Sequence, residues 1–295
     1  MGAVTGRSRA PGWVLALAVV ALATGAAAAD LPIVDTHLHY SRNSWEQYAP
    51  EGILGLLDAA GIRRAFVSST PDDGTLRLRQ AAPDRIVPVL RPYREAGELG
   101  SWHRDPSVVG YLEGRLKPGI YRGIGEFHLS GEDARSAVVR QVAALARRHG
   151  LFLHCHCDAE AAEILVGLGA DLRVLWAHAG MSSGPDVVAR LLARHPALTV
   201  ELALRSDVAP GGRLDPAWRV LFLRYPDRFM VGTDTWIPSR WAELQGVQEA
   251  TRAWLRQLPA DVAAVEAPHR LVKGGVLAQP AMRSRCRAWS RTACR

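Results

Sequence analysis

The sequence predicts a single-domain (β/α)8 TIM barrel, in which eight parallel strands alternate with helices around one core. Short apolar runs recur eight times along the 295-residue chain, and amphipathic stretches separate them. Most of these runs lack polar alternation, as expected of parallel strands that are buried on both faces. Eight strand–helix units in about 230 residues also match the usual size of such a barrel. A doubly wound open sheet is the alternative, but no glycine-rich phosphate loop follows the first run.

Each expected strand is one of these apolar runs, and the expected helices lie between them. Gly61, Gly150 and Gly169 each follow an expected helix, where a left-handed C-cap favours glycine. Pro185 and Asp186 suit the start of a helix. The expected strands are 31–39, 65–70, 86–92, 123–129, 151–157, 173–178, 198–204 and 229–235. The expected helices include 52–60, 133–149, 158–168, 185–194, 217–225 and 237–258.

The first 29 residues have the three parts of a secretory signal peptide. Arg7 and Arg9 form a basic region, residues 13–24 carry no charge, and residues 25–29 are glycine and alanine. A membrane anchor is the alternative, but these small residues fit a signal peptidase better than they fit lipid. We therefore expect a periplasmic or secreted protein without stable membrane insertion after cleavage.

The net charge of +7 is concentrated near the C-terminus. Residues 269–295 contain seven Lys or Arg and no Asp or Glu, whereas residues 30–268 sum to −2. The folded body therefore lacks the basic surface of a nucleic-acid-binding protein, and we expect a small-molecule substrate. The expected organisation is a signal peptide at 1–29, the barrel at 30–262 and a basic, poorly ordered tail at 263–295. The oligomeric state is left open.

The four cysteines fall into two pairs. Cys155 and Cys157 alternate with histidines on an expected strand, so they should face the covering helices. We expect both as buried free thiols. An exported chain also allows a disulfide between Cys286 and Cys294.

Two His-x-His pairs are the most informative motifs. The first pair, His37 and His39, ends the first expected strand, and the second pair, His154 and His156, lies on the fifth. Residues two apart on a strand point to the same face, so each pair aims two imidazoles in one direction. Converging histidines suit zinc and its first-row neighbours.

Other ionisable residues end further strands. Glu126 and His128 lie on the fourth expected strand, His178 ends the sixth and Asp234 lies at the end of the eighth. Because barrel enzymes keep their chemistry at the carboxyl ends of the strands, these side chains should gather at one rim with the histidine pairs. His156 and His128 are expected to line the pocket or to support the ligands.

Two arginines also end strands near this rim. Arg91 follows the third expected strand and Arg205 the seventh. Either could bind a substrate carboxylate through its forked guanidinium, although an ion pair at the rim would explain each of them equally well. Aromatic residues that could form the pocket wall are Tyr40, Trp45, Trp102 and Trp236.

The ordered set of strand-end residues resembles the amidohydrolase superfamily of metal-dependent hydrolases, and most closely its amidohydrolase-related branch, over residues 32–258. Many members bridge two metals with a carboxylated lysine on the fourth strand. Neither Lys117 nor Lys273 is placed for that role, and Glu126 takes the equivalent position, as in branches where a glutamate bridges. The metal ligands that the resemblance implies are His37, His39, Glu126, His154, His178 and Asp234.

The implied site would bind one or two divalent ions, most simply zinc, with manganese or iron as alternatives. A His/Asp ligand set of this kind leaves a coordination position for water, and the metal lowers the pKa of that water to about 7. Asp234 would accept the proton and pass it to the leaving group. His178 would complete the coordination or polarise the substrate carbonyl. The expected reaction is hydrolysis of an ester, lactone or amide.

Three other functions are compatible with these residues. A TatD-type deoxyribonuclease is one, because residues 123–126 resemble its fourth-strand motif, although the charge of the folded body argues against it. A decarboxylase of the same branch would use the same metal and a carboxylate-binding arginine. A non-catalytic metal- or ligand-binding barrel would keep His37 and His39 but would not need Asp234.

Overall fold

The structure is a computed structural model that describes residues 1–2 and 31–263. Apart from its first two residues, the signal peptide expected at 1–29 lies outside this part of the chain. Residues 264–295 of the expected tail also lie outside it, together with Cys286 and Cys294. Within the described residues, no helix combines the length and the apolar character that a membrane span requires.

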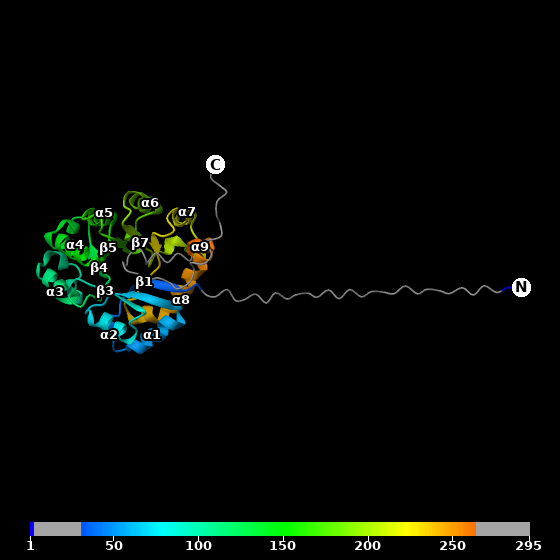
Figure 1. Ribbon diagram of the computed structural model, residues 1–295, viewed down its shortest axis with the longest axis horizontal. Coiled ribbons are helices and arrows are strands. Elements are labelled where there is room, and N and C mark those ends of the chain that lie inside the picture. The colour runs from blue at the N-terminus through cyan, green and yellow to red at the C-terminus, as the bar shows by residue number, and fades with distance from the viewer. Residues whose placement is uncertain (3–30, 264–295) are drawn as a thin grey trace. The chain divides into compact units, whose positions relative to one another are not determined.

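Eight parallel strands form one sheet whose spatial order is the order of the sequence (Figure 1). The end of β1 also pairs with the segment after β8: Leu38 bridges Thr235, and the backbone N–H of His39 donates to the carbonyl of Thr235 at 2.8 Å. These bonds join the two edges of the sheet, so the expected barrel is confirmed. The strands are β1 Ile33–Leu38, β2 Ile62–Val67, β3 Ile86–Leu90, β4 Gly123–Leu129, β5 Phe152–Cys157, β6 Val174–Trp176, β7 Leu198–Glu201 and β8 Phe229–Met230.

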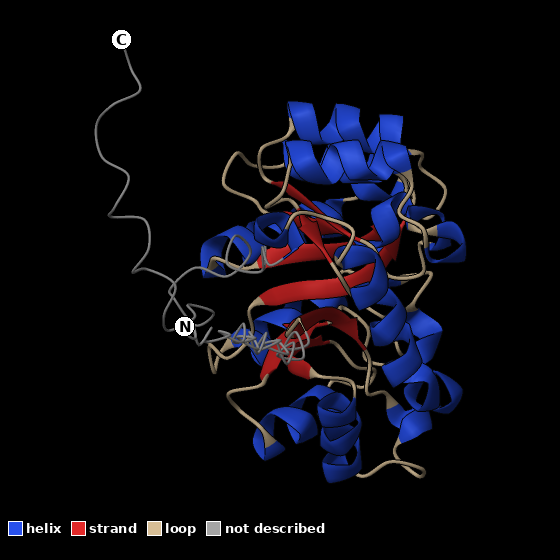
Figure 2. Ribbon diagram, turned by 90° about the vertical axis from the view of Figure 1, so that its right-hand side faces the viewer, coloured by secondary structure: helices blue, strands red, loops and turns tan. Residues whose placement is uncertain are grey.

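Helices surround the strands, as Figure 2 shows in blue around red. The helices are α1 Pro50–Ala59, α2 Asp73–Ala81, α3 Ser107–Leu116, α4 Ala137–His149, α5 Ala159–Gly167, α6 Pro185–Arg194, α7 Pro216–Arg224, α8 Pro238–Leu255 and α9 Ala260–Ala263. The sequence analysis did not single out α2 and α3. Helix α3 contains Gly110 and Gly114, which are poor helix formers, so packing rather than propensity stabilises it.

Some details differ from the expectations and others agree with them. Strand β2 begins earlier than expected, because the polar pair Arg63 and Arg64 belongs to it. Gly61 and Gly150 have the expected left-handed backbone, with φ of 63° and 67°. Gly169 does not, because α5 ends with Leu168 in a right-handed turn.

The cysteine expectation was wrong in one respect. Cys155 and Cys157 are buried and lie in the core between the sheet and the helices, as expected. They form a disulfide with each other, however, and are not free thiols. Alternation along β5 places both sulfurs on the same face, and a Cα–Cα distance of 5.5 Å is within the range of disulfides.

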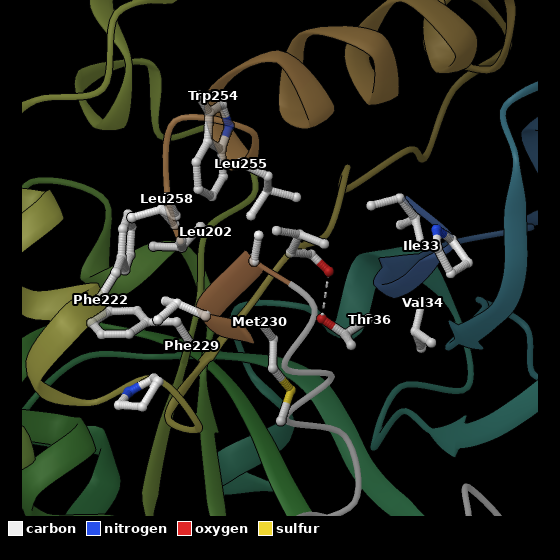
Figure 3. A pocket seen from close by; sticks show the side chains of 15 residues that line it. Ile33, Val34, Thr36, Leu202, Phe222, Phe229, Met230, Trp254, Leu255 and Leu258 are labelled. Carbon is white, nitrogen blue, oxygen red and sulfur yellow. Dashed lines mark hydrogen bonds between the residues drawn. The ribbon is translucent and has the colours of Figure 1, made fainter. Parts of the chain in front are cut away.

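The barrel interior is apolar at the amino ends of the strands. Its side chains form a separate cluster made of Val34, Phe66, Val87, Val89, Phe152, Leu175 and Met230. Beside this cluster, a cavity of about 70 Å³ lies between β1, β8 and α8, and none of the side chains that line it is ionisable (Figure 3). Because this cluster and this cavity are both apolar, the ionisable side chains that face the barrel interior lie at the carboxyl ends of the strands.

Strand β1 contains a register shift close to its carboxyl end. Its pairing register with β2 shifts between Asp35 and Leu38. An extra residue in a strand reverses which side chains point inward. The shift therefore allows Val34 to join the apolar interior while His37 and His39, at odd positions, also face inward.

Candidate metal centre

Strand β1 brings two buried imidazoles together. The Nε2 atoms of His37 and His39 are 3.1 Å apart. The Nδ1 atom of His37 lies 3.0 Å from a carboxylate oxygen of Glu201, and that of His39 lies 2.6 Å from the carbonyl oxygen of Ser68. These acceptors engage the Nδ1 atom of each ring, so the two Nε2 atoms face each other and are the atoms available to a metal ion.

Two carboxylates converge on the same point. Glu126 from β4 places Oε2 3.2 Å from the Nε2 of His37 and 3.1 Å from that of His39. Asp234, which follows β8, places Oδ1 3.1 Å from the Nε2 of His39. The four ligand atoms all lie within 4.8 Å of one another. Although burial opposes the charge, Glu126 and Asp234 hold the pKa of His37 above its ordinary value, and a divalent cation would take the place of that proton and bind all four groups.

His178 approaches the same group from the end of β6. Its Nδ1 donates to the carbonyl of Ala203 at 2.9 Å, so its Nε2 offers a lone pair in the neutral ring and an N–H in the protonated ring. Although burial opposes the charge, the contact with Glu126 raises the pKa of His178. This buried Nε2 has no hydrogen-bond partner and lies 3.4 Å from Oε1 of Glu126. His178 and Asp234 both have a left-handed backbone, with φ of 55° and 47°. Such strain in non-glycine residues is typical of functional sites.

The two histidines of β5 have different positions. His154 packs against the ring of His37, with 4.5 Å between centroids, and its buried Nε2 has no hydrogen-bond partner. The structure does not place a nitrogen of His154 within the four-residue group. Burial and the neighbouring His37 hold the pKa of His154 well below its ordinary value, so its ring is neutral. His156 instead reaches the carboxylate, with its Nδ1 3.0 Å from Oε1 of Glu126.

Glu126 therefore faces two groups of histidines. Its Oε2 is directed to the β1 pair and its Oε1 to His156. His128 stacks on His156 at 4.2 Å, and its Nδ1 lies 3.1 Å from the hydroxyl of Tyr93. Burial lowers the pKa of His128 to about 4, which leaves the ring neutral and able to act as a ligand. This is the placement that a carboxylate bridging two ions would need. Glu126, His128 and His156 are one of three groups among the described residues that could hold a cation, together with the four-residue group and the group of His37, His178 and Glu201.

The sequence analysis missed two buried carboxylates that support the centre. Glu201 in β7 accepts hydrogen bonds from Nδ1 of His37 and from the backbone N–H of His178 at 3.2 Å. Asp35 in β1 accepts from the backbone N–H of His37 at 3.0 Å and from the hydroxyl of Thr233 at 2.9 Å. Burial raises the pKa of Asp35 to about 6. A signal was present, because each is an acidic residue in an otherwise apolar strand and needs a partner there.

The two arginines lie in different places. Arg91 donates to Oε2 of Glu126 at 2.8 Å and to the hydroxyl of Thr70 at 3.3 Å, and it lines the cavity next to the centre. Arg205 donates to both carboxylate oxygens of Asp207 and to three backbone carbonyls of the segment between β6 and α6. All of its N–H groups are thus occupied, and Arg205 does not line that cavity.

A cavity of about 780 Å³ adjoins the centre, which is the usual size of a small-molecule site. It contains His39, Glu126 and Asp234 from the ligand group, with Arg91 beside them. The remaining lining residues are Ser41, Arg42, Asn43, Glu46, Thr70, Tyr93, Ala96, Leu99, His128, His156, Leu204 and Trp236. Trp236 is the one member of the expected aromatic wall among them.

Gly125 is required for the close approach of β4 and β5 at this centre. Its φ is +138°, and a Cβ at this position would lie 2.2 Å from the carbonyl oxygen of His154. We expect Gly125→Ala to lower the free energy of unfolding by about 2–5 kcal/mol, measured by urea denaturation. Gly55→Ala is the matched control, because a Cβ there, in α1, meets nothing within 4 Å. That change should stabilise the protein by about 0.5–1 kcal/mol, and equal effects of the two substitutions would contradict this account.

No family model matches the chain, and no curated protein sequence is significantly similar to it. Solved structures do resemble it. A putative 2-pyrone-4,6-dicarboxylic acid hydrolase from Pseudomonas putida has a TM-score of 0.57 at 20% identity, over 82% of this chain and 97% of that one. An amidohydrolase from Burkholderia multivorans with bound zinc has a TM-score of 0.55 at 16% identity, over 81% and 98%.

A TatD homologue from Escherichia coli is similar to the same degree, with a TM-score of 0.55 at 16% identity over 83% of this chain and 99% of that one. At these identities the likeness establishes the fold. The chain has the same (β/α)8 barrel fold as these proteins.

Proposed function

We propose that this protein is an exported, metal-dependent hydrolase that cleaves an ester, lactone or amide. The observation that carries the proposal is the convergence of His37, His39, Glu126 and Asp234, whose ligand atoms all lie within 4.8 Å of one another. A bound divalent ion, most simply zinc, would act there as a Lewis acid and lower the pKa of water to about 7. The zinc in the Burkholderia structure supports this choice of metal.

Asp234 is the residue best placed to move protons. It lines the cavity and is only 7% exposed. Although burial opposes ionisation, His37 and His39 hold the pKa of Asp234 below its ordinary value, so it is a carboxylate at neutral pH. The guanidinium of Arg240 donates to its backbone carbonyl at 2.9 Å and keeps it in place. Asp234 would take a proton from the attacking water and return it to the leaving group.

Arg91 and His178 are proposed to act on the substrate carbonyl. Arg91 makes three hydrogen bonds to protein oxygens, and its Nη2 also lies 3.2 Å from Nε2 of His39. These contacts hold its guanidinium at the cavity and leave one N–H of Nη1 for a carbonyl oxygen. The Nε2 of His178, which lacks a hydrogen bond, would complete the ligand set or approach the same oxygen. Donors that are fixed before the reaction stabilise a developing oxyanion more than mobile donors do.

The ligand atoms of His37, His39, Glu126 and Asp234 could bind one ion, and a second ion could bind beside it. The second ion would share Glu126 and take His156 and His128 as its other ligands. Of the β5 pair, His156 rather than His154 is therefore the histidine that we propose as a ligand. His154 would support the ring of His37 from behind.

Glu201 is proposed to orient two of the ligands. Its carboxylate fixes the tautomer of His37 and also accepts from the backbone of His178. We expect Glu201→Gln to weaken zinc binding about 10- to 100-fold, because a neutral amide holds the ring less firmly and makes it a poorer donor. Competition with a chromophoric chelator measures this affinity. Glu243→Gln, at an exposed position of α8, is the control and should leave the affinity unchanged.

The proposed function is tested by metal reconstitution. The purified protein is stripped of metal, restored with zinc or manganese, and assayed on lactones, esters, amides, a 2-hydroxybenzoate-type acid and DNA. Metal-dependent turnover of a lactone, ester or amide would support the hydrolase. Release of CO₂ from the acid would favour the decarboxylase, and cleavage of DNA would favour the nuclease. Bound metal without turnover of any of these compounds would overturn the hydrolase in favour of a binding protein.

A further inference from the structure

Exposed apolar side chains gather at the mouth of the catalytic cavity. Within residues 31–263, six large apolar side chains are more than a third exposed, and four of them surround this mouth. Leu99, Leu204 and Trp236 line the cavity itself, and Met181 lines an adjoining hollow that shares Leu99, His128 and His156 with it. We call Leu99, Met181, Leu204 and Trp236 the apolar rim. They belong to four different strand–helix connections.

Two members of the apolar rim are held on unfavourable backbone. Leu204 has φ of 62° and Met181 has φ of 57°, which side chains other than glycine and asparagine rarely adopt. Such strain in non-glycine residues is typical of binding sites. The side chains that this backbone presents are 40% and 46% exposed, so packing within the described residues covers them only in part, and a ligand at the mouth would bury more of their apolar surface.

Part of the mouth is polar. Ser41, Arg42, Asn43 and Glu46, all from the segment between β1 and α1, line the cavity there. The amide of Asn43 donates to the backbone carbonyl of Trp236 at 3.1 Å, so this polar side joins the apolar rim at one point. The cavity is thus amphipathic across its mouth, with the ionisable groups of the metal centre at its floor.

We propose that the substrate is a carboxylic ester or lactone with an alkyl or aryl chain, which the apolar rim binds while the carbonyl lies at Asp234. This inference rests on the proposed function. In the reaction, the oxygen of water bonds to the carbonyl carbon as the C–O bond to the alcohol breaks. One proton of the water reaches the alcohol oxygen through Asp234. The other leaves as the acid product ionises.

A chain-length series tests this assignment. The zinc-restored protein is assayed on γ-lactones from γ-butyrolactone to γ-nonanolactone, with D-glucono-δ-lactone as a polar comparison. Burial of one methylene is worth about 0.8 kcal/mol, or about fourfold in kcat/KM. We therefore expect kcat/KM to rise about two- to fourfold for each methylene over the first steps, and the polar lactone to be the poorest substrate.

Leu204→Asn connects the effect to the apolar rim, because asparagine tolerates positive φ and removes the apolar surface. The ratio of kcat/KM for γ-nonanolactone to that for γ-butyrolactone should fall about three- to tenfold. This ratio does not depend on the fraction of protein that folds. Leu223→Asn is the matched control, since Leu223 on α7 is also 40% exposed, and it should leave the ratio unchanged.

The outcomes separate this inference from the proposed function. Turnover of the lactones without a chain-length dependence, or with one that Leu204→Asn leaves intact, would overturn the apolar rim but not the hydrolase. A change of oligomeric mass in Leu204→Asn with an unchanged ratio would assign the rim to a second copy of the chain and would also overturn the inference. Absence of metal-dependent turnover of every lactone and ester would overturn the proposed function itself.

Discussion

Asp234→Asn is expected to lower kcat about 10²- to 10⁴-fold while the protein stays folded and retains bound metal. Asparagine keeps an oxygen atom that can bind the metal, and it tolerates the left-handed backbone at this position, where φ is 47°. It cannot accept a proton from water at neutral pH, however. His37, His39 and Glu126 remain as ligands, so metal content should change much less than turnover. Steady-state kinetics on the best lactone or ester, together with metal analysis of the same samples, measures both effects.

Asp186→Asn is the control for this substitution. Asp186 is exposed at the start of α6, where its carboxylate pairs with Arg190 at 2.9 Å, and it does not line the cavity next to the centre. Its loss should change kcat less than about twofold, since a surface ion pair contributes at most about 1 kcal/mol and does not touch the site. Retention of nearly full kcat by Asp234→Asn would remove Asp234 from the mechanism.

His37→Gln is expected to abolish the thermal stabilisation that zinc produces. A ligand present at 100 times its Kd stabilises the native state by about 2.7 kcal/mol. For a domain of this size that corresponds to a rise in Tm of about 5–10 °C. His37 lies at the centre of the group, within 3.5 Å of His39, Glu126 and Asp234. Without its Nε2, zinc at the same concentration should raise Tm by less than about 2 °C.

Two comparisons make the thermal experiment specific. His195→Gln alters a half-buried histidine that lies 3.3 Å from Glu163, outside the metal centre, and it should preserve the full zinc response. Magnesium, which prefers oxygen ligands, should stabilise the wild-type protein less than zinc does. An equal zinc response of His37→Gln and the wild-type protein would show that the ion binds elsewhere.

Sequence reasoning recovered the barrel because its signals are local. Apolar runs between helical stretches identified every strand, and the residues of the four-residue group were located by their positions at strand ends. The end of β8 was the least accurate boundary, since the strand ends at Met230 and not at Thr235. Strand β2 begins three residues early, because Arg63 and Arg64 give its start polar side chains. Alternation along β5 predicted that Cys155 and Cys157 face the helices. It could not predict that the two sulfurs form a bond.

The finer details of the centre depend on distances that no local pattern contains. His154 and His156 both face inward, and only their depth along β5 decides which one reaches Glu126. The role of Glu201 depends on its contact with His37, which is 164 positions away in the sequence. Arg205 ends a strand as Arg91 does, yet its hydrogen bonds to Asp207 and to backbone carbonyls turn it away from the cavity.

The central claim is that His37, His39, Glu126 and Asp234 hold one cation, and anomalous diffraction at the zinc absorption edge tests it most directly. The account predicts a peak at the carboxyl ends of the strands, about 2.0–2.2 Å from the Nε2 atoms of His37 and His39 and from carboxylate oxygens of Glu126 and Asp234. Crystals of zinc-treated protein that show no peak between these side chains, with Arg91 still bonded to Glu126, would contradict it.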